Sequence, residues 1–124
     1  MKSVISIAAV AILAGCVSLP TPEQSASADY GAYPGDYDSV VKSYYARVLK
    51  DPESARYGSI TSPQQYWLGN RFDGAKYGYL VCATVNARNS YGGYVGNQTD
   101  GLLIRNGSVI LTIEKGDWFG RQIC

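Results

Sequence analysis

One stretch near the middle of the chain, residues 79–88, most constrains what this sequence can fold into, because its side chains alternate in polarity. One set of alternate positions is apolar throughout: Tyr79, Val81, Ala83, Val85 and Ala87. The other set changes from apolar to polar along the stretch: Leu80, Cys82, Thr84, Asn86 and Arg88. A period of two residues is typical of a β-strand. The pattern therefore predicts a central strand with one buried face and one face that emerges into water.

The first residues of the chain have the features of an export signal. After a short basic start, an apolar run of about eleven residues is too short to span a ~30 Å bilayer core as a stable helix. The run ends in Leu13-Ala14-Gly15-Cys16, which resembles the lipobox of bacterial lipoproteins. The resemblance implies that residues 1–15 are a signal peptide and that fatty acyl chains such as palmitate are attached to Cys16. The alternatives are an ordinary secreted protein and a buried N-terminal helix.

A lipid on Cys16 tethers a protein to a membrane without spanning it. Val17 and Ser18 follow this cysteine, at positions where lipoproteins retained in the inner membrane of Gram-negative bacteria often have aspartate. By that resemblance we expect the protein in the bacterial cell envelope, at the inner leaflet of the outer membrane, facing the periplasm. The expected partners are the membrane, through the lipid anchor, and a second envelope protein.

The charge balance argues against a large basic surface. The chain has 11 Lys and Arg residues and 10 Asp and Glu residues. Since Lys2 leaves with the signal peptide, the remaining basic and acidic residues balance. Proteins that bind nucleic acids through phosphates carry a clear basic excess on one face. We therefore expect no nucleic-acid partner.

The two cysteines beyond Cys16 form a natural pair in an exported protein. Disulfides form and persist in oxidising compartments. We therefore predict a disulfide between Cys82, on the central strand, and Cys124. The alternative is two reduced cysteines. A metal site is not expected, because the chain has no histidine and two cysteines cannot complete a tetrahedral site.

The composition divides the rest of the chain into a tether and a domain. Residues 16–35 are rich in Ser, Ala, Pro and Gly, which predicts a lipidated, flexible tether. The alternative is an ordered arm along the domain, docked by Tyr30, Tyr33 and Tyr37. Residues 36–124 are expected to form a single domain.

The pattern of elements predicts an α+β fold. A helix is expected from about Ser39 to Leu49, capped by Asp36 or Asp38, with an apolar side that includes Val41, Tyr44 and Val48. Pro52 should then start a second, short helical segment through Arg56. Strands are expected at 57–61, 64–68, 79–87, 101–105 and 108–113, with a loop at 69–74.

Asn106-Gly107 predicts a type I′ hairpin between the last two strands. One amphipathic helix should therefore pack on a mostly antiparallel sheet of about three to five strands, stapled by the disulfide. The expected core facing the helix is Val81, Ala83, Val85, Leu103, Val109 and Leu111. The Trp118-Phe119 pair should pack as the tail returns to Cys82.

Two segments, residues 49–57 and 81–96, are similar to signatures of a family of small exported bacterial domains. The first follows a Leu-Lys-Asp-Pro-x-Ser-Ala pattern at the end of a helix, and the second a strand and loop of the form Val-Asn-Ala-Lys-Asn-Ser-Tyr-Gly-Gly-Tyr. This chain departs from the pattern at Arg88, where lysine is usual. The resemblance implies an exported, often lipid-anchored domain and implies no particular activity.

Catalysis is not expected. The chain has no histidine for general acid–base work, and no serine or cysteine lies in a nucleophile motif. Asp100, Glu114 and Asp117 could cluster, but solvated loop carboxylates are the simpler interpretation. We therefore expect a protein that is not an enzyme and that holds no cofactor.

The candidate binding loop follows the central strand. Tyrosine, asparagine, glycine and arginine are typical of polar recognition surfaces. Here they occur together at Asn86, Arg88, Asn89, Tyr91, Gly92, Gly93 and Tyr94. The alternative is that Asn89 and the glycines only make a tight turn while the tyrosines cover the sheet. The pattern favours a protein-interaction or structural accessory module. The other possibilities are a module that binds a small ligand or a glycan such as peptidoglycan, and an inhibitor of a wall-degrading enzyme.

Overall fold

The computed structural model describes residues 18–124. The predicted signal peptide, residues 1–15, and the predicted lipidation site, Cys16, lie outside these residues. Within the described part of the chain, no helix is long and apolar enough to cross a membrane.

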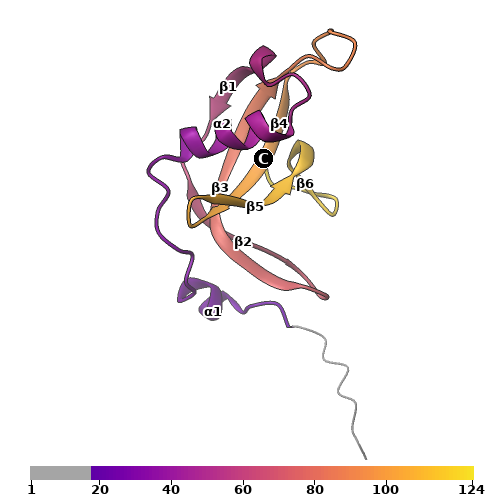
Figure 1. Cartoon of the computed structure of the whole chain (residues 1–124). Coiled ribbons are helices and arrows are strands. Elements are labelled where there is room, and N and C mark those ends of the chain that lie inside the picture. Colours follow the sequence, from indigo (N-terminus) through magenta and orange to yellow (C-terminus); the bar gives the residue numbers. More distant parts are fainter. Residues whose placement is uncertain (1–17) are drawn as a thin grey trace, which may run out of the picture.

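The fold is α+β, as predicted: one main helix packs on a five-stranded antiparallel sheet (Figure 1). The strands pair in the order β1-β3-β4-β5, and β2 also pairs with β3. A separate small hairpin, β6 and β7, follows the sheet. The strand bounds are β1 Arg56–Ile60, β2 Gln64–Asn70, β3 Gly74–Asn86, β4 Gln98–Arg105, β5 Ser108–Ile113, β6 Asp117–Trp118 and β7 Arg121–Gln122.

Strand β3 organises the sheet, as the alternating pattern predicted, and it is longer than expected. Its early half pairs with β2, its late half pairs with β1, and β4 runs along its other edge. The predicted loop at 69–74 shrinks to a tight turn, because the Asn70 side chain accepts hydrogen bonds from the backbone N–H groups of Phe72 and Asp73. The Asn106-Gly107 turn is confirmed, with positive φ angles of 50° and 77°.

Helix α2, Tyr37–Val48, covers one face of the sheet (Figure 1). Asp36 is its N-cap residue, although its side chain makes no capping hydrogen bond. The prediction of the buried side was partly wrong, because Val48 is exposed and Tyr45 is buried instead. Val41 and Tyr45 lie one helical turn apart, so the helix contacts the sheet along a narrow stripe. The short segment after it is a 3₁₀ turn, Pro52–Ser54.

The sheet carries a hydrophobic core on each face. Under α2 the buried residues are Val41, Tyr45, Val81, Ala83, Val85, Leu102 and Ile104. On the opposite face they are Leu68, Leu80, Leu103 and Ile113. The prediction that Leu103 and Leu111 face the helix is therefore wrong. Leu103 pairs with Leu80, not with Val81, and a shift of one residue moves a side chain to the other face.

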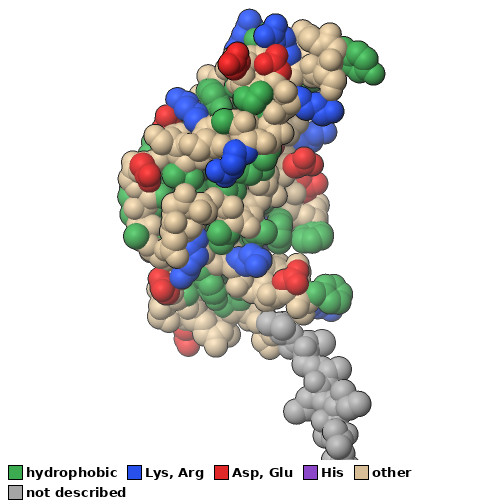
Figure 2. Space-filling model, viewed as in Figure 1, with side chains coloured by type: hydrophobic (Ala, Val, Ile, Leu, Met, Phe, Trp, Pro, Cys, Tyr) green, Lys and Arg blue, Asp and Glu red, His purple; other side chains and the backbone are tan. Residues whose placement is uncertain are grey.

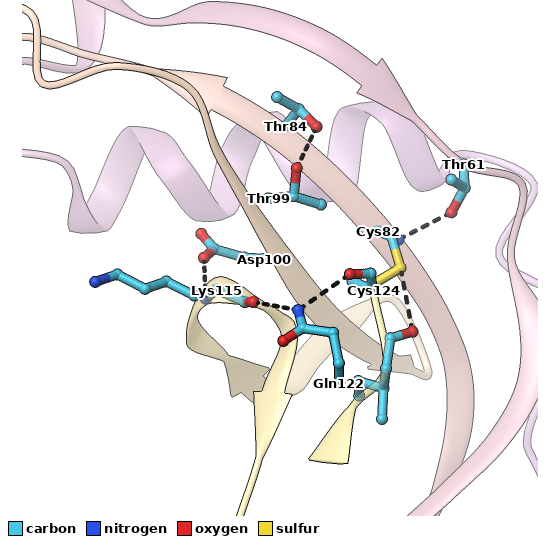
Figure 3. Close-up of a disulfide and its surroundings, with 9 residues drawn as sticks. Thr61, Cys82, Thr84, Thr99, Asp100, Lys115, Gln122 and Cys124 are labelled. Atoms are coloured by element: carbon cyan, nitrogen blue, oxygen red, sulfur yellow. Dashed lines mark hydrogen bonds between the residues drawn. A yellow bond between two sulfur atoms is a disulfide. The ribbon is translucent and has the colours of Figure 1, made fainter. Parts of the chain in front are cut away.

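The predicted disulfide between Cys82 and Cys124 is confirmed, and Figure 3 shows how it ties the tail to β3. The Cα atoms of the two cysteines are 5.7 Å apart. Trp118 packs against the core on this side, as expected. The same expectation fails for Phe119, because its side chain is 81% exposed.

The segment before α2 is an ordered arm, which corrects the prediction of a flexible tether for this part of the chain. It contains a short helix, α1, Pro22–Ala26. Arg105 holds the arm to the sheet, because one guanidinium nitrogen donates to the backbone carbonyl of Asp29 at 2.6 Å. Tyr30 is buried and packs edge-to-face on Tyr77, with ring centres 5.4 Å apart. The folded body therefore begins before residue 36.

Candidate functional site

The candidate loop is shaped by a single asparagine side chain. The side-chain oxygen Oδ1 of Asn89 accepts hydrogen bonds from the backbone N–H groups of Tyr91 and Gly93, at 2.9 and 3.2 Å. Gly92 has a φ of 83°, which glycine adopts without strain. Asn89 and Gly92 therefore make the tight turn that was predicted as the alternative to a binding surface, and this leaves a binding role for the loop open.

The base of the loop is closed by a second asparagine. The Asn86 side-chain oxygen accepts a hydrogen bond from the backbone N–H of Gly96 at 3.0 Å, across the loop. Next to it, the backbone N–H of Val95 donates to the carbonyl of Ala87. Arg88 and Tyr94 form an isolated β-bridge. The two sides of the loop therefore continue the antiparallel pairing of β3 and β4 beyond the ends of these strands.

The segment after α2 braces the loop from the side. The Ser54 hydroxyl accepts a hydrogen bond from the backbone N–H of Arg88 at 2.9 Å, and the Ser54 carbonyl accepts one from the Tyr94 hydroxyl at 3.0 Å. The guanidinium of Arg88 pairs with the carboxylate of Asp51 at 3.2 Å. The two segments that carry the family resemblance, far apart in the sequence, thus form one structural unit.

The aromatic ring of Tyr94 is also engaged internally. The guanidinium of Arg56 lies 4.0 Å from its centre, and that of Arg88 lies 5.9 Å away. A cation over an aromatic face is stabilising, so these contacts hold the ring in place. Both residues were predicted to contact a partner. Both support the loop from within, and both keep part of their side chains exposed, 44% for Arg88 and 38% for Tyr94.

Tyr91 is the most exposed of the large hydrophobic side chains of the loop. Its side chain is 96% exposed, and its backbone N–H is bonded to Asn89. Val95, at the far side of the loop, is exposed as well. Figure 2 shows hydrophobic side chains at the tip of the upper right projection, where Figure 1 places the connection between β3 and β4, with basic side chains beside it. The loop is therefore a stiff support with an aromatic side chain at its tip.

A buried carboxylate, Asp100, was missed by sequence reasoning, which treated it as a solvated loop residue. It lies on β4 under α2 and is 5% exposed. One of its oxygens accepts from the Tyr45 hydroxyl at 2.6 Å. The other accepts from the side chain of Gln98 at 2.7 Å and from the backbone N–H of Lys115 at 3.0 Å, the last of these drawn in Figure 3.

Burial raises the pKa of Tyr45 well above its ordinary value, and the hydrogen bond to Asp100 raises it further. The phenol therefore stays protonated and keeps donating to the carboxylate. Because Tyr45 is 3% exposed and all the oxygens of Asp100 are occupied, the pair has no room for a substrate. Its role is structural: it joins the helix, the sheet and the start of the tail.

Within residues 18–124, no three acidic or cysteine side chains come close enough together to hold a metal ion. Glu114 and Asp117 are exposed, whereas Asp100 is buried, so the three carboxylates do not form one cluster.

No family model matches the chain, and no curated protein or solved structure is significantly similar to it. The resemblance to the family of small exported domains therefore stays a prediction.

Proposed function

We propose that this chain is a lipid-anchored protein of the bacterial envelope that binds a protein partner through the loop at residues 87–96. One observation carries the proposal: Tyr91 is 96% exposed on a loop whose shape is held by internal hydrogen bonds. A loop that is already ordered loses little conformational entropy on binding. Tyrosine is one of the residues that most often dominate protein interfaces.

The arrangement of the other tyrosines supports a protein partner over a glycan. A glycan-binding surface needs open aromatic faces. Tyr30, Tyr45 and Tyr79 are buried instead, and several rings pack edge-to-face on one another. On the loop itself Tyr91 is the aromatic side chain that protrudes furthest. One protruding ring fits a pocket on another protein better than it fits the flat face of a sugar.

Binding of a small polar ligand or a glycan is the second candidate, and one observation favours it. A groove of about 520 Å³ lies beside the base of the loop, and side chains with hydroxyl and amide groups line it, among them Gln98, Thr99 and Gln122. Such groups can position hydroxyl-rich ligands. In either case the proposed role is binding without catalysis.

If Cys16 carries the lipid anchor, we expect the Cys16→Ser variant to differ in signal-peptide cleavage and localisation. Serine has no thiol to accept the lipid, so we expect an uncleaved or mislocalised precursor. The measurement is fractionation of the envelope together with the mass of the mature N-terminus. A Cys16→Ser protein that is processed and membrane-bound like the unmodified chain would contradict the lipid anchor, while leaving the binding loop open to its own test.

The loop predicts a loss of binding in the Tyr91→Ala variant. We expect partner capture from solubilised envelopes to fall by about tenfold or more, because an interface anchor contributes well over 1 kcal/mol. The melting temperature should hardly change, since the side chain contacts little of the fold. A photo-crosslinking amino acid at position 91 should give one discrete adduct in cells.

Phe72→Ala is the matched control. Phe72 is 91% exposed at the turn between β2 and β3, so it is an equally accessible aromatic on another tip. Capture should survive its removal. Equal capture by Tyr91→Ala and Phe72→Ala would contradict the proposed loop. Retention on peptidoglycan after protein is stripped would support the second candidate.

A further inference from the structure

A shallow groove of about 570 Å³ lies between helix α2 and the β6–β7 hairpin, away from the loop at 87–96. Three aromatic side chains line it: Tyr44 from α2, and Trp118 and Phe119 from the hairpin. Two carboxylates line it as well, Glu114 and Asp117, and no lysine or arginine does. In Figure 2, acidic and hydrophobic side chains lie together on the right-hand side, around the place where Figure 1 shows β6.

Phe119 has a strained backbone conformation that no packing of its side chain in the core compensates. It occupies the first position of the two-residue turn with Gly120, with a φ of 48°. Such turns favour asparagine, aspartate or glycine at this position, because a bulky side chain is strained there. Since 81% of the side chain is exposed, burial does not compensate the strain. The residue lies against Trp118, with ring centres 4.9 Å apart.

Neither carboxylate makes an ion pair with a basic side chain of residues 18–124. The ion pairs of that region join Lys42 to Asp38, Arg88 to Asp51 and Arg105 to Asp29, and none involves Glu114 or Asp117. Lys115, which lies between them in the sequence, lines the other groove, beside the base of the loop. The groove therefore has a negative charge that no ion pair of the described residues neutralises.

We propose that this groove binds a basic segment of a protein partner, with a lysine or arginine side chain between the aromatic rings and the two carboxylates. Aromatic faces attract cations, and carboxylates form strong hydrogen bonds with them. Tyr44 can contribute a further contact, because its hydroxyl accepts from Thr112 and keeps its own proton to donate to a peptide carbonyl.

The groove is also held ready for binding. The backbone N–H of Ile123 donates to the carbonyl of Gly116 at 2.8 Å, and the disulfide fixes Cys124 to β3 directly beyond it. The hairpin that carries Trp118 and Phe119 is thus tied at its base. The hairpin therefore loses little conformational entropy when a peptide binds. This inference is independent of the loop proposed above.

The test is an NMR titration of the folded chain with two synthetic peptides, at about 50 mM salt, where screening is weak. One is acetyl-Gly-Lys-Gly-Arg-Gly-amide; the other replaces its basic residues by acetyl-lysine and citrulline. We expect the basic peptide to give saturable shifts at Glu114, Asp117 and Phe119. The neutral peptide should give none. Saturable shifts with both peptides, or with neither, would overturn the proposal.

Matched variants distinguish binding in this groove from a general electrostatic attraction between the basic peptide and the protein. Glu114→Gln with Asp117→Asn keeps the shape and the oxygen of Asp117 that accepts from Gly120, and should weaken binding by about tenfold or more. Glu23→Gln with Glu53→Gln removes the same charge elsewhere and should leave the affinity unchanged. Equal weakening by the two pairs would overturn the proposal.

Phe119→Asn gives an opposite pair of effects. Asparagine suits the turn, so we expect the melting temperature to rise by about 4 °C. The affinity for the basic peptide should fall in the same variant, because one wall of the groove is lost. Unchanged affinity in Phe119→Asn would overturn the proposal, because Phe119 is one of the aromatic walls of the groove.

Discussion

Replacing Cys82 and Cys124 together by alanine is expected to lower the free energy of unfolding by about 4 kcal/mol. The two cysteines are separated by 42 positions in the sequence, and a loop of that length restricts the unfolded chain strongly. The alanine replacement also removes packing, because the Cys82 side chain packs against the core on the face opposite α2. Urea unfolding of the double variant and the unmodified chain measures the difference.

Reduction of the unmodified protein is the control for this prediction, because it breaks the bond and keeps the sulfur atoms. If chain entropy dominates, the reduced protein and the double alanine variant should have similar unfolding midpoints. An oxidised protein with the same midpoint as both would contradict the prediction.

Replacing Asp100 by alanine is expected to cost about 3 kcal/mol. Three donors lose their acceptor at once: the Tyr45 hydroxyl, the Gln98 side chain and the Lys115 backbone N–H. A buried donor left without a partner, here the Tyr45 hydroxyl, costs about 1–3 kcal/mol. The other two donors are only partly buried and add less, and relief of the buried charge offsets part of the sum. The measurement is again the midpoint of urea unfolding.

Asp100→Asn is the matched variant. Its oxygen can still accept from Gln98 and Lys115, and its amide can donate to the Tyr45 hydroxyl, so the loss should be smaller. Tyr45→Phe completes a double-mutant cycle with Asp100→Ala, in which we expect a coupling energy of about 1 kcal/mol or more. Additive effects would show that the hydrogen bond between Tyr45 and Asp100 contributes little.

The central strand could be predicted because alternation is a local property. Each side chain of residues 79–88 indicates its own face, without knowledge of any partner. The neighbouring strand could not be treated in this way. Leu102, Leu103 and Ile104 are all apolar and all buried, so the pattern contains no information on which of them faces the helix. Only the pairing of Leu103 with Leu80 decides it.

Asp100 was missed for a related reason. An aspartate near the start of a strand is usually solvated, and the residue that makes its burial possible, Tyr45, is on the helix, far away in the sequence. Likewise the loop residues were identified from composition, but their separate roles were not. The turn made by Asn89 is local; the brace from Ser54 to Arg88 and Tyr94 depends on the tertiary fold.

The order of the strands along the chain has a consequence for how the chain folds as it emerges, N-terminus first, in the compartment where it folds. β1 and β2 are synthesised first, yet both pair with β3, and the helix has no complete surface to cover until β4 has emerged. The opposite face gains Trp118 and Ile123 still later. A chain that has emerged only as far as β5 leaves Leu68, Leu80 and Leu103 without this cover. Uncovered apolar surface of this kind promotes aggregation. Productive folding therefore waits for almost the whole domain.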